Sequence, residues 1–88
     1  MPAVNVTLLS KPGCHLCDVA RVVVDEVVTE LADDASAPSI TVEESSILDD
    51  PQLLERFAEE IPVVLVNGAV HTIWRVDAAR LRVAILEA

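Results

Sequence analysis

Hydrophobic positions recur along this chain with two different periods, which indicates alternating strands and helices. Residues 4–9 form a short apolar run, which predicts a strand, and the turn sequence of residues 10–13 ends it. From residue 14 to about 32, charged residues fill one helical face, and an amphipathic helix is favoured. Its apolar positions are Leu16, Ala20, Val23, Val24, Val27 and Leu31. The valines of 22–24 and 27–28 make a strand the alternative, because β-branched residues lose rotamer freedom in helices.

A second strand and a second helix are expected after a polar connector. Residues 39–43 alternate between polar and apolar, which predicts a strand. Asp49 or Asp50 is suited to cap a helix whose first position is Pro51. The inward face of this helix is expected to consist of Leu53, Leu54, Phe57 and Ala58.

The last third of the chain predicts a hairpin and a final helix. Residues 63–66 are apolar on both faces, as in a central strand, and Asn67-Gly68 is a strong hairpin signal before a return strand over 69–75. Asp77 would cap a last helix that carries Leu81, Ala84 and Ile85. The order βαβαββα predicts one α/β domain over residues 1–88, with a central four-stranded mixed sheet flanked by helices on both faces.

Composition and charge narrow the classes of function. The 88 residues are 52% hydrophobic and mostly aliphatic, which fits one compact core. No apolar run approaches the ~18 residues that cross a bilayer, so no membrane association is expected. Residues 1–6 lack the basic start of a secretory signal, which predicts a cytoplasmic location. A net charge of −9 argues against nucleic acid as a partner, because phosphate binding needs a basic face.

The two cysteines of the chain lie where the first strand gives way to the first helix, as Cys14-His15-Leu16-Cys17. A thiol at a helix N-terminus meets free N–H groups and the positive end of the dipole, and both favour the nucleophilic thiolate. The i, i+3 spacing places the second sulfur within reach of the first. This pattern predicts thiol–disulfide exchange. Zinc is the alternative, but His15 and His71 are the only added soft ligands, so a closed site would need a dimer.

Two segments carry a resemblance to a known family. Residues 6–17 read VTLLSKPGCHLC, and residues 61–68 read IPVVLVNG. Together and in this order they resemble the small glutaredoxins of the thioredoxin fold, over nearly the whole chain. Typical glutaredoxins have Cys-Pro-Tyr-Cys, and after the hairpin they carry Gly-Gly-x-Asp, which helps to hold glutathione. This chain has His15-Leu16 between its cysteines and bulky residues at 72–77.

The resemblance implies a thiol–disulfide oxidoreductase that acts on a disulfide-containing protein or a low-molecular-weight thiol such as glutathione or an analogue. Cys14 would attack and Cys17 would resolve the mixed disulfide. No bound metal, nucleotide or flavin is implied. Two alternatives stay open: a redox-inactive binding module that holds a peptide in its Pro62 groove, and a zinc protein.

Further residues are candidates for binding the thiol substrate. The resemblance implies a cis Ile61–Pro62 bond against the cysteines, whereas the residues alone favour a trans proline that opens a strand. Lys11 would stabilise the thiolate or a substrate carboxylate, and His15 would donate to the thiolate; the alternative for both is a solvated side chain. Arg75 would contact a carboxylate of a thiol cofactor. Trp74 is expected in the core, with a lip over the active-site groove as the alternative.

Overall fold

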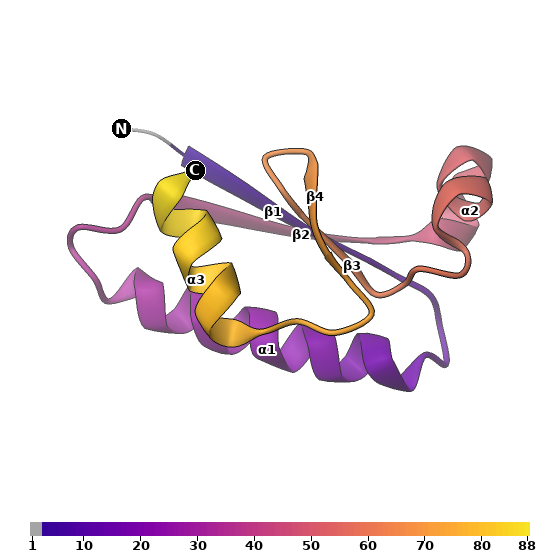
Figure 1. Cartoon of the computed structure of the whole chain (residues 1–88), viewed down its shortest axis with the longest axis horizontal. Coiled ribbons are helices and arrows are strands. Elements are labelled where there is room, and N and C mark those ends of the chain that lie inside the picture. Colours follow the sequence, from indigo (N-terminus) through magenta and orange to yellow (C-terminus); the bar gives the residue numbers. More distant parts are fainter. Residues whose placement is uncertain (1–2) are drawn as a thin grey trace.

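A computed structural model describes residues 3–88 and has the predicted element order, βαβαββα (Figure 1). A 3-10 turn, η1, is the only addition within these residues. The elements are β1 (Ala3–Ser10), α1 (His15–Ala32), β2 (Ser39–Ser46), η1 (Ile47–Asp49), α2 (Pro51–Phe57), β3 (Val63–Val66), β4 (Ala69–Ile73) and α3 (Ala78–Glu87). The chain therefore has an α/β thioredoxin-like fold with a mixed four-stranded sheet.

The strand order is β2-β1-β3-β4, which places β1 inside the sheet. β1 pairs with β2 in parallel along all eight residues and with β3 in antiparallel orientation. β3 and β4 form the predicted hairpin, with a bulge between Val64 and Leu65. β2 continues to Ser46, three residues beyond the predicted end at Glu43, because its partner β1 offers backbone groups over the same length.

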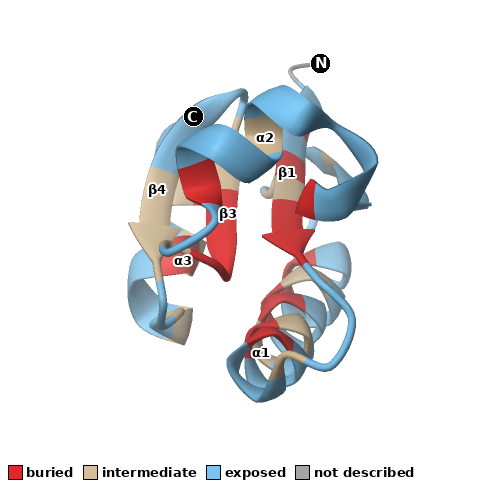
Figure 2. Cartoon of the chain, turned by 90° about the vertical axis from the view of Figure 1, so that its right-hand side faces the viewer, coloured by how far each residue is buried: buried red, intermediate tan, exposed pale blue. Residues whose placement is uncertain are grey.

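Two hydrophobic clusters cover the two faces of the sheet, because successive strand residues point to opposite sides. The larger cluster lies between the sheet and helices α1 and α3, and its buried residues are Val4, Val6, Leu8, Ala20, Val24, Val27, Leu31, Val64, Leu81 and Ile85. The smaller cluster on the other face contains Leu9, Cys17, Ile47, Phe57, Ile61 and Val63. Figure 2 shows these buried positions in red along β1, β3 and the inner side of α1.

Helix α2 covers only one end of the second sheet face, at the right of Figure 1. Helices α1 and α3 pack on the other face; in this view α1 runs below the sheet and α3 rises at the left. The prediction that Leu54 and Ala58 face inward is wrong, because both are exposed. The short helix buries Phe57 and half-buries Leu53, which lie four residues apart on one face. Leu54 and Ala58 each follow one of these residues and are therefore rotated about 100° around the helix axis, away from the core.

Two other predicted positions differ for local reasons. Leu16 is 42% exposed, because the buried stripe of α1 begins one residue later, at Cys17. The return strand β4 ends at Ile73 and not at Arg75, because Trp74 has a φ of 66°. A residue in that left-handed region takes the backbone out of the extended conformation.

Candidate active site

The two cysteines form a disulfide across the first turn of α1. Cys14 is the N-cap residue of α1, and its Sγ accepts a hydrogen bond of 3.2 Å from the N–H of Cys17. The Cα atoms lie 5.2 Å apart. Gly13, with φ 75°, supplies the left-handed turn that brings the chain from β1 into the cap. The strand-to-helix junction therefore holds one sulfur directly at the positive end of the helix.

The two sulfurs differ in their access to solvent. Cys17 is fully buried, at 0% exposure, within the smaller hydrophobic cluster. Cys14 is partly exposed and packs against the same cluster from outside. An approaching thiol or disulfide therefore reaches Cys14 first, and Cys17 is accessible only through it.

The loop before β3 packs beside the cysteine pair. The Ile61–Pro62 peptide bond is cis, so the resemblance is confirmed here and the trans expectation from the residues alone is wrong. Ile61 lies in the same hydrophobic cluster as Cys17, and Pro62 is fully buried. Cys17 and Ile61, which are 44 positions apart along the chain, thus meet at one end of the sheet.

Trp74 directly follows β4 and is hydrogen-bonded to this loop, outside the core. Its side chain is 54% exposed, so the prediction of a core residue is wrong. The indole N–H donates to the carbonyl of Glu59 at 2.9 Å, and the backbone N–H donates to the carbonyl of Pro62 at 2.8 Å. A φ of 66° for so bulky a residue costs about 1–3 kcal/mol, and these contacts hold the residue in that conformation.

A charged network runs beside the first two turns of α1. Arg21 donates two hydrogen bonds to Glu44 of β2, at 2.7 and 2.6 Å, and one to Asp18 at 2.9 Å. Ser10, only 4% exposed, also donates to Glu44 at 2.9 Å. The hydrogen bond from Arg21 holds the pKa of Glu44 below its usual value. The same contacts, with Glu44 first and Asp18 second, raise the pKa of Arg21.

Only part of this network has a signal in the local sequence. Asp18 and Arg21 are three residues apart on a helix, a spacing that favours an ion pair. Glu44 and Ser10 join them only because of the register between β1 and β2. Glu44 is the partner of Leu8, and Ser10 lies two residues further along β1 on the same face. The pairing of distant strands carries no local sequence signal.

Three proposed binding residues are all exposed: Lys11, His15 and Arg75. Lys11 borders a surface hollow of about 330 Å³ next to the cap of α1, together with Asp18, Arg21 and Glu44. His15 is the first residue of α1, and Arg75 directly follows Trp74. Within residues 3–88, none of the three side chains forms a hydrogen bond or an ion pair.

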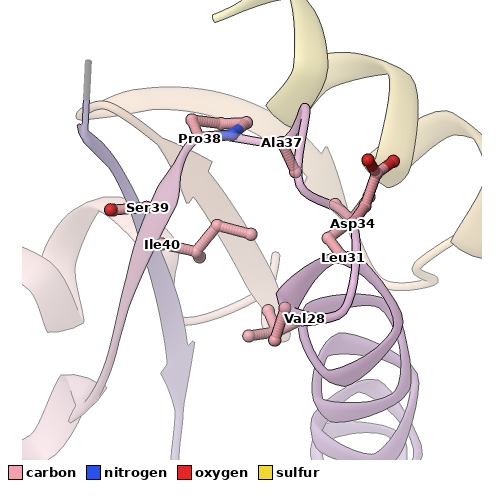
Figure 3. A pocket seen from close by; sticks show the side chains of 8 residues that line it. Val28, Leu31, Asp34, Ala37, Pro38, Ser39 and Ile40 are labelled. Carbon is pink, nitrogen blue, oxygen red and sulfur yellow. The ribbon is translucent and has the colours of Figure 1, made fainter. Parts of the chain in front are cut away.

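Other features lie away from the cysteines. A hollow of about 370 Å³ occurs at the far end of the 18-residue helix α1, about 27 Å along its axis from the disulfide (Figure 3). His71 lies on β4 against α3. In the described part of the chain, no three His, Cys, Asp or Glu residues cluster as metal ligands. Over the same residues, no helix has the length and apolar character needed to span a bilayer.

Proteins from other organisms are similar to this chain in sequence. An uncharacterized protein of Mycobacterium tuberculosis is 35% identical over 81 residues, which cover 92% of this chain and 81% of the relative. A thioredoxin of Methanocaldococcus jannaschii is 31% identical over 74 residues, covering 83% and 81% of the two chains.

Solved structures of other proteins are similar to this chain in fold. A protein from X. campestris superposes with a TM-score of 0.65 at 26% identity, covering 94% of this chain and 97% of the other. Oxidised thioredoxin from Plasmodium falciparum, at 11% identity, shares the fold with a TM-score of 0.61, covering 96% and 79% of the two chains. The model of the glutaredoxin-like domain (DUF836) matches residues 5–86, and the chain therefore belongs to this glutaredoxin-like family.

Proposed function

We propose that this protein is a cytosolic dithiol–disulfide oxidoreductase. The observation that carries the proposal is the position of Cys14, whose sulfur caps α1 and accepts the N–H of Cys17. In the reduced protein a thiolate at this position gains a charge-assisted hydrogen bond and the helix dipole, whereas a neutral thiol gains little from either. The buried Cys17 is already at bridging distance.

The reaction proceeds in two exchange steps. The Cys14 thiolate attacks one sulfur of a partner disulfide, the partner S–S bond breaks, and the other partner sulfur leaves as a thiolate that takes up a proton. Cys17 then loses its proton and attacks the Cys14 sulfur, which forms the internal disulfide and releases the second partner thiol. The partner gains two electrons and two protons, and the cysteine pair is oxidised. A low-molecular-weight thiol such as glutathione or an analogue, or a dithiol protein, reduces the pair again.

The loop at Ile61 supports binding of an extended peptide. Within residues 3–88, neither the N–H nor the C=O of Ile61 forms a hydrogen bond with another backbone group. Backbone groups that have no partner beside a reactive sulfur are suited to pair with a substrate strand. In this proposal Lys11, His15 and Arg75 contribute exposed donors to carboxylate or thiolate groups of the bound partner.

The first test is the reactivity of Cys14. In a Cys17→Ser variant with its thiol reduced, we expect iodoacetamide to label Cys14 faster at pH 7 than it labels a cysteine in an unstructured peptide. Labelling at the same rate would contradict the proposal, because the cap would then supply no thiolate.

The second test is disulfide exchange itself. The wild-type protein should reduce insulin with a dithiol reductant, the Cys14→Ser variant should lose this activity, and Cys17→Ser should accumulate mixed disulfides. A Cys14→Ser/Cys17→Ser protein that binds the same partners while the wild-type protein reduces none of them would identify a binding module.

A further inference from the structure

We propose that Trp74 selects the substrate: its exposed ring contacts an apolar side chain that flanks the disulfide of a polypeptide partner. This inference rests on the proposed thiol–disulfide exchange at Cys14. Trp74 would thus favour protein disulfides over small thiol compounds.

The conformation of Trp74 is unfavourable on its own terms. A large side chain at φ 66° is an outlier, and an indole with 54% exposure gains little from burial. Outliers of this kind persist where the surrounding structure fixes them, and they cluster at functional sites. Glycine would fit the same backbone without strain. Folding alone therefore provides no reason for a tryptophan at this position.

The ring is held in place by the loop beneath it. The indole N–H bonds the carbonyl of Glu59, and the backbone N–H bonds the carbonyls of Pro62 at 2.8 Å and Glu60 at 3.3 Å. A fixed aromatic ring loses little side-chain freedom when a partner binds. Because its N–H already has an acceptor, the exposed part of the indole offers an apolar surface only.

The position of Trp74 connects it to the reactive sulfurs. The preceding residue, Ile73, packs against the hydrophobic cluster that contains Cys17. Cys14 packs against the same cluster. In addition, the backbone N–H of Trp74 donates a hydrogen bond to the carbonyl of Pro62, the residue that follows the cis peptide bond. A polypeptide whose disulfide reaches Cys14 and whose backbone pairs with Ile61 therefore has flanking residues near the ring.

The charges around the ring favour the same kind of partner. Glu59 and Glu60 belong to the loop whose backbone carbonyls accept hydrogen bonds from the indole and backbone N–H groups of Trp74, and the chain carries a net charge of −9. A small acidic thiol would be repelled by these carboxylates, apart from any contact with Arg75. An apolar or basic polypeptide segment meets no such repulsion.

The test compares two substrates in three proteins. For the wild type, Trp74→Gly and Val83→Ala, kcat/KM is measured with a cyclic peptide disulfide flanked by leucine and with bis(2-hydroxyethyl) disulfide. Val83 is the control, since it is 51% exposed on α3. The measured quantity is kcat/KM for the peptide divided by kcat/KM for the small disulfide. We expect Trp74→Gly to lower this ratio about tenfold by raising the KM of the peptide, as for an aromatic contact residue. Val83→Ala should leave the ratio unchanged. An unchanged ratio in Trp74→Gly would overturn the proposal.

A binding measurement separates this inference from the proposed function. Trp74 is the only tryptophan, and the chain has no tyrosine, so indole emission reports on this residue alone. A Cys14→Ser/Cys17→Ser protein is titrated with the leucine-flanked peptide in which serine replaces both cysteines. A blue shift that saturates supports the contact even if the wild type reduces no disulfide. No shift at millimolar peptide would refute it, even if exchange at Cys14 is fast.

Discussion

Asp18 and Arg21 carry opposite charges on the first turns of α1, so they should shift the pH midpoint of Cys14 alkylation in opposite directions. Asp18 is four residues beyond the cap and Arg21 seven, so they lie about 6 and about 10 Å along the helix from Cys14. In a dielectric near that of water, these separations correspond to about 0.7 and about 0.4 kcal/mol. Asp18→Asn should therefore lower the pH midpoint of Cys14 alkylation by about 0.5, and Arg21→Gln should raise it by about 0.3.

The assay is the rate of iodoacetamide labelling against pH, in a Cys17→Ser background so that only Cys14 reacts. Asp25→Asn is the matched control, because this exposed carboxylate on α1 is eleven residues from the cap and its field is largely screened. In 1 M salt the two shifts should fall to near zero. Shifts of the same sign for Asp18→Asn and Arg21→Gln, or an equal shift for Asp25→Asn, would refute the electrostatic reasoning.

Three predictions concern stability and are measured by urea unfolding. Ile85→Ala should cost about 2–5 kcal/mol because the side chain is fully buried, whereas Leu86→Ala beside it, 45% exposed, should cost less than about 1 kcal/mol; equal losses would contradict the core assignment. Gly68→Ala should cost about 1 kcal/mol through the backbone alone, since φ is 82° and a Cβ would meet no atom within 4 Å. Burial, and then the charge of Arg80, lowers the pKa of His71, so the folded state binds this proton less readily than the unfolded chain. The contribution of neutral His71 to the free energy of unfolding should be fully present above about pH 6.5 and be lost as the pH falls below it. His71→Gln should therefore reduce the dependence of the free energy of unfolding on pH between about pH 7.5 and 5.

The order of the elements could be predicted because each long element has its own local signal. The first helix forms despite its β-branched residues because Val24 and Val27 lie on the buried stripe, where packing outweighs propensity. The end of β2 could not be predicted, since this edge strand is exposed along most of its length and its residues after Glu43 do not alternate. Its length is set by the pairing with β1, which is information from a distant part of the chain.

In the candidate site too, some features have a local sequence signal and others do not. The cysteines and the cap geometry followed from their place between a turn and a helix. The position of Trp74 did not, because hydrophobicity predicts burial. The residue is instead fixed outside the core by hydrogen bonds to the loop before β3, 12 to 15 residues earlier in the chain. The bidentate contact between Arg21 and Glu44 spans 23 residues and depends on how α1 lies against β2. Local patterns predict local structure, and these contacts are not local.

Burial of the inner sulfur has a consequence for damage by peroxide. In the reduced protein, hydrogen peroxide can reach the Cys14 thiolate but not the fully enclosed Cys17, so oxidation yields a sulfenic acid on Cys14 with loss of water. Cys17 is one helical turn away and displaces the hydroxyl as a second water, which closes the disulfide. The chain thereby stops at a reversible stage before sulfinic or sulfonic acid can form.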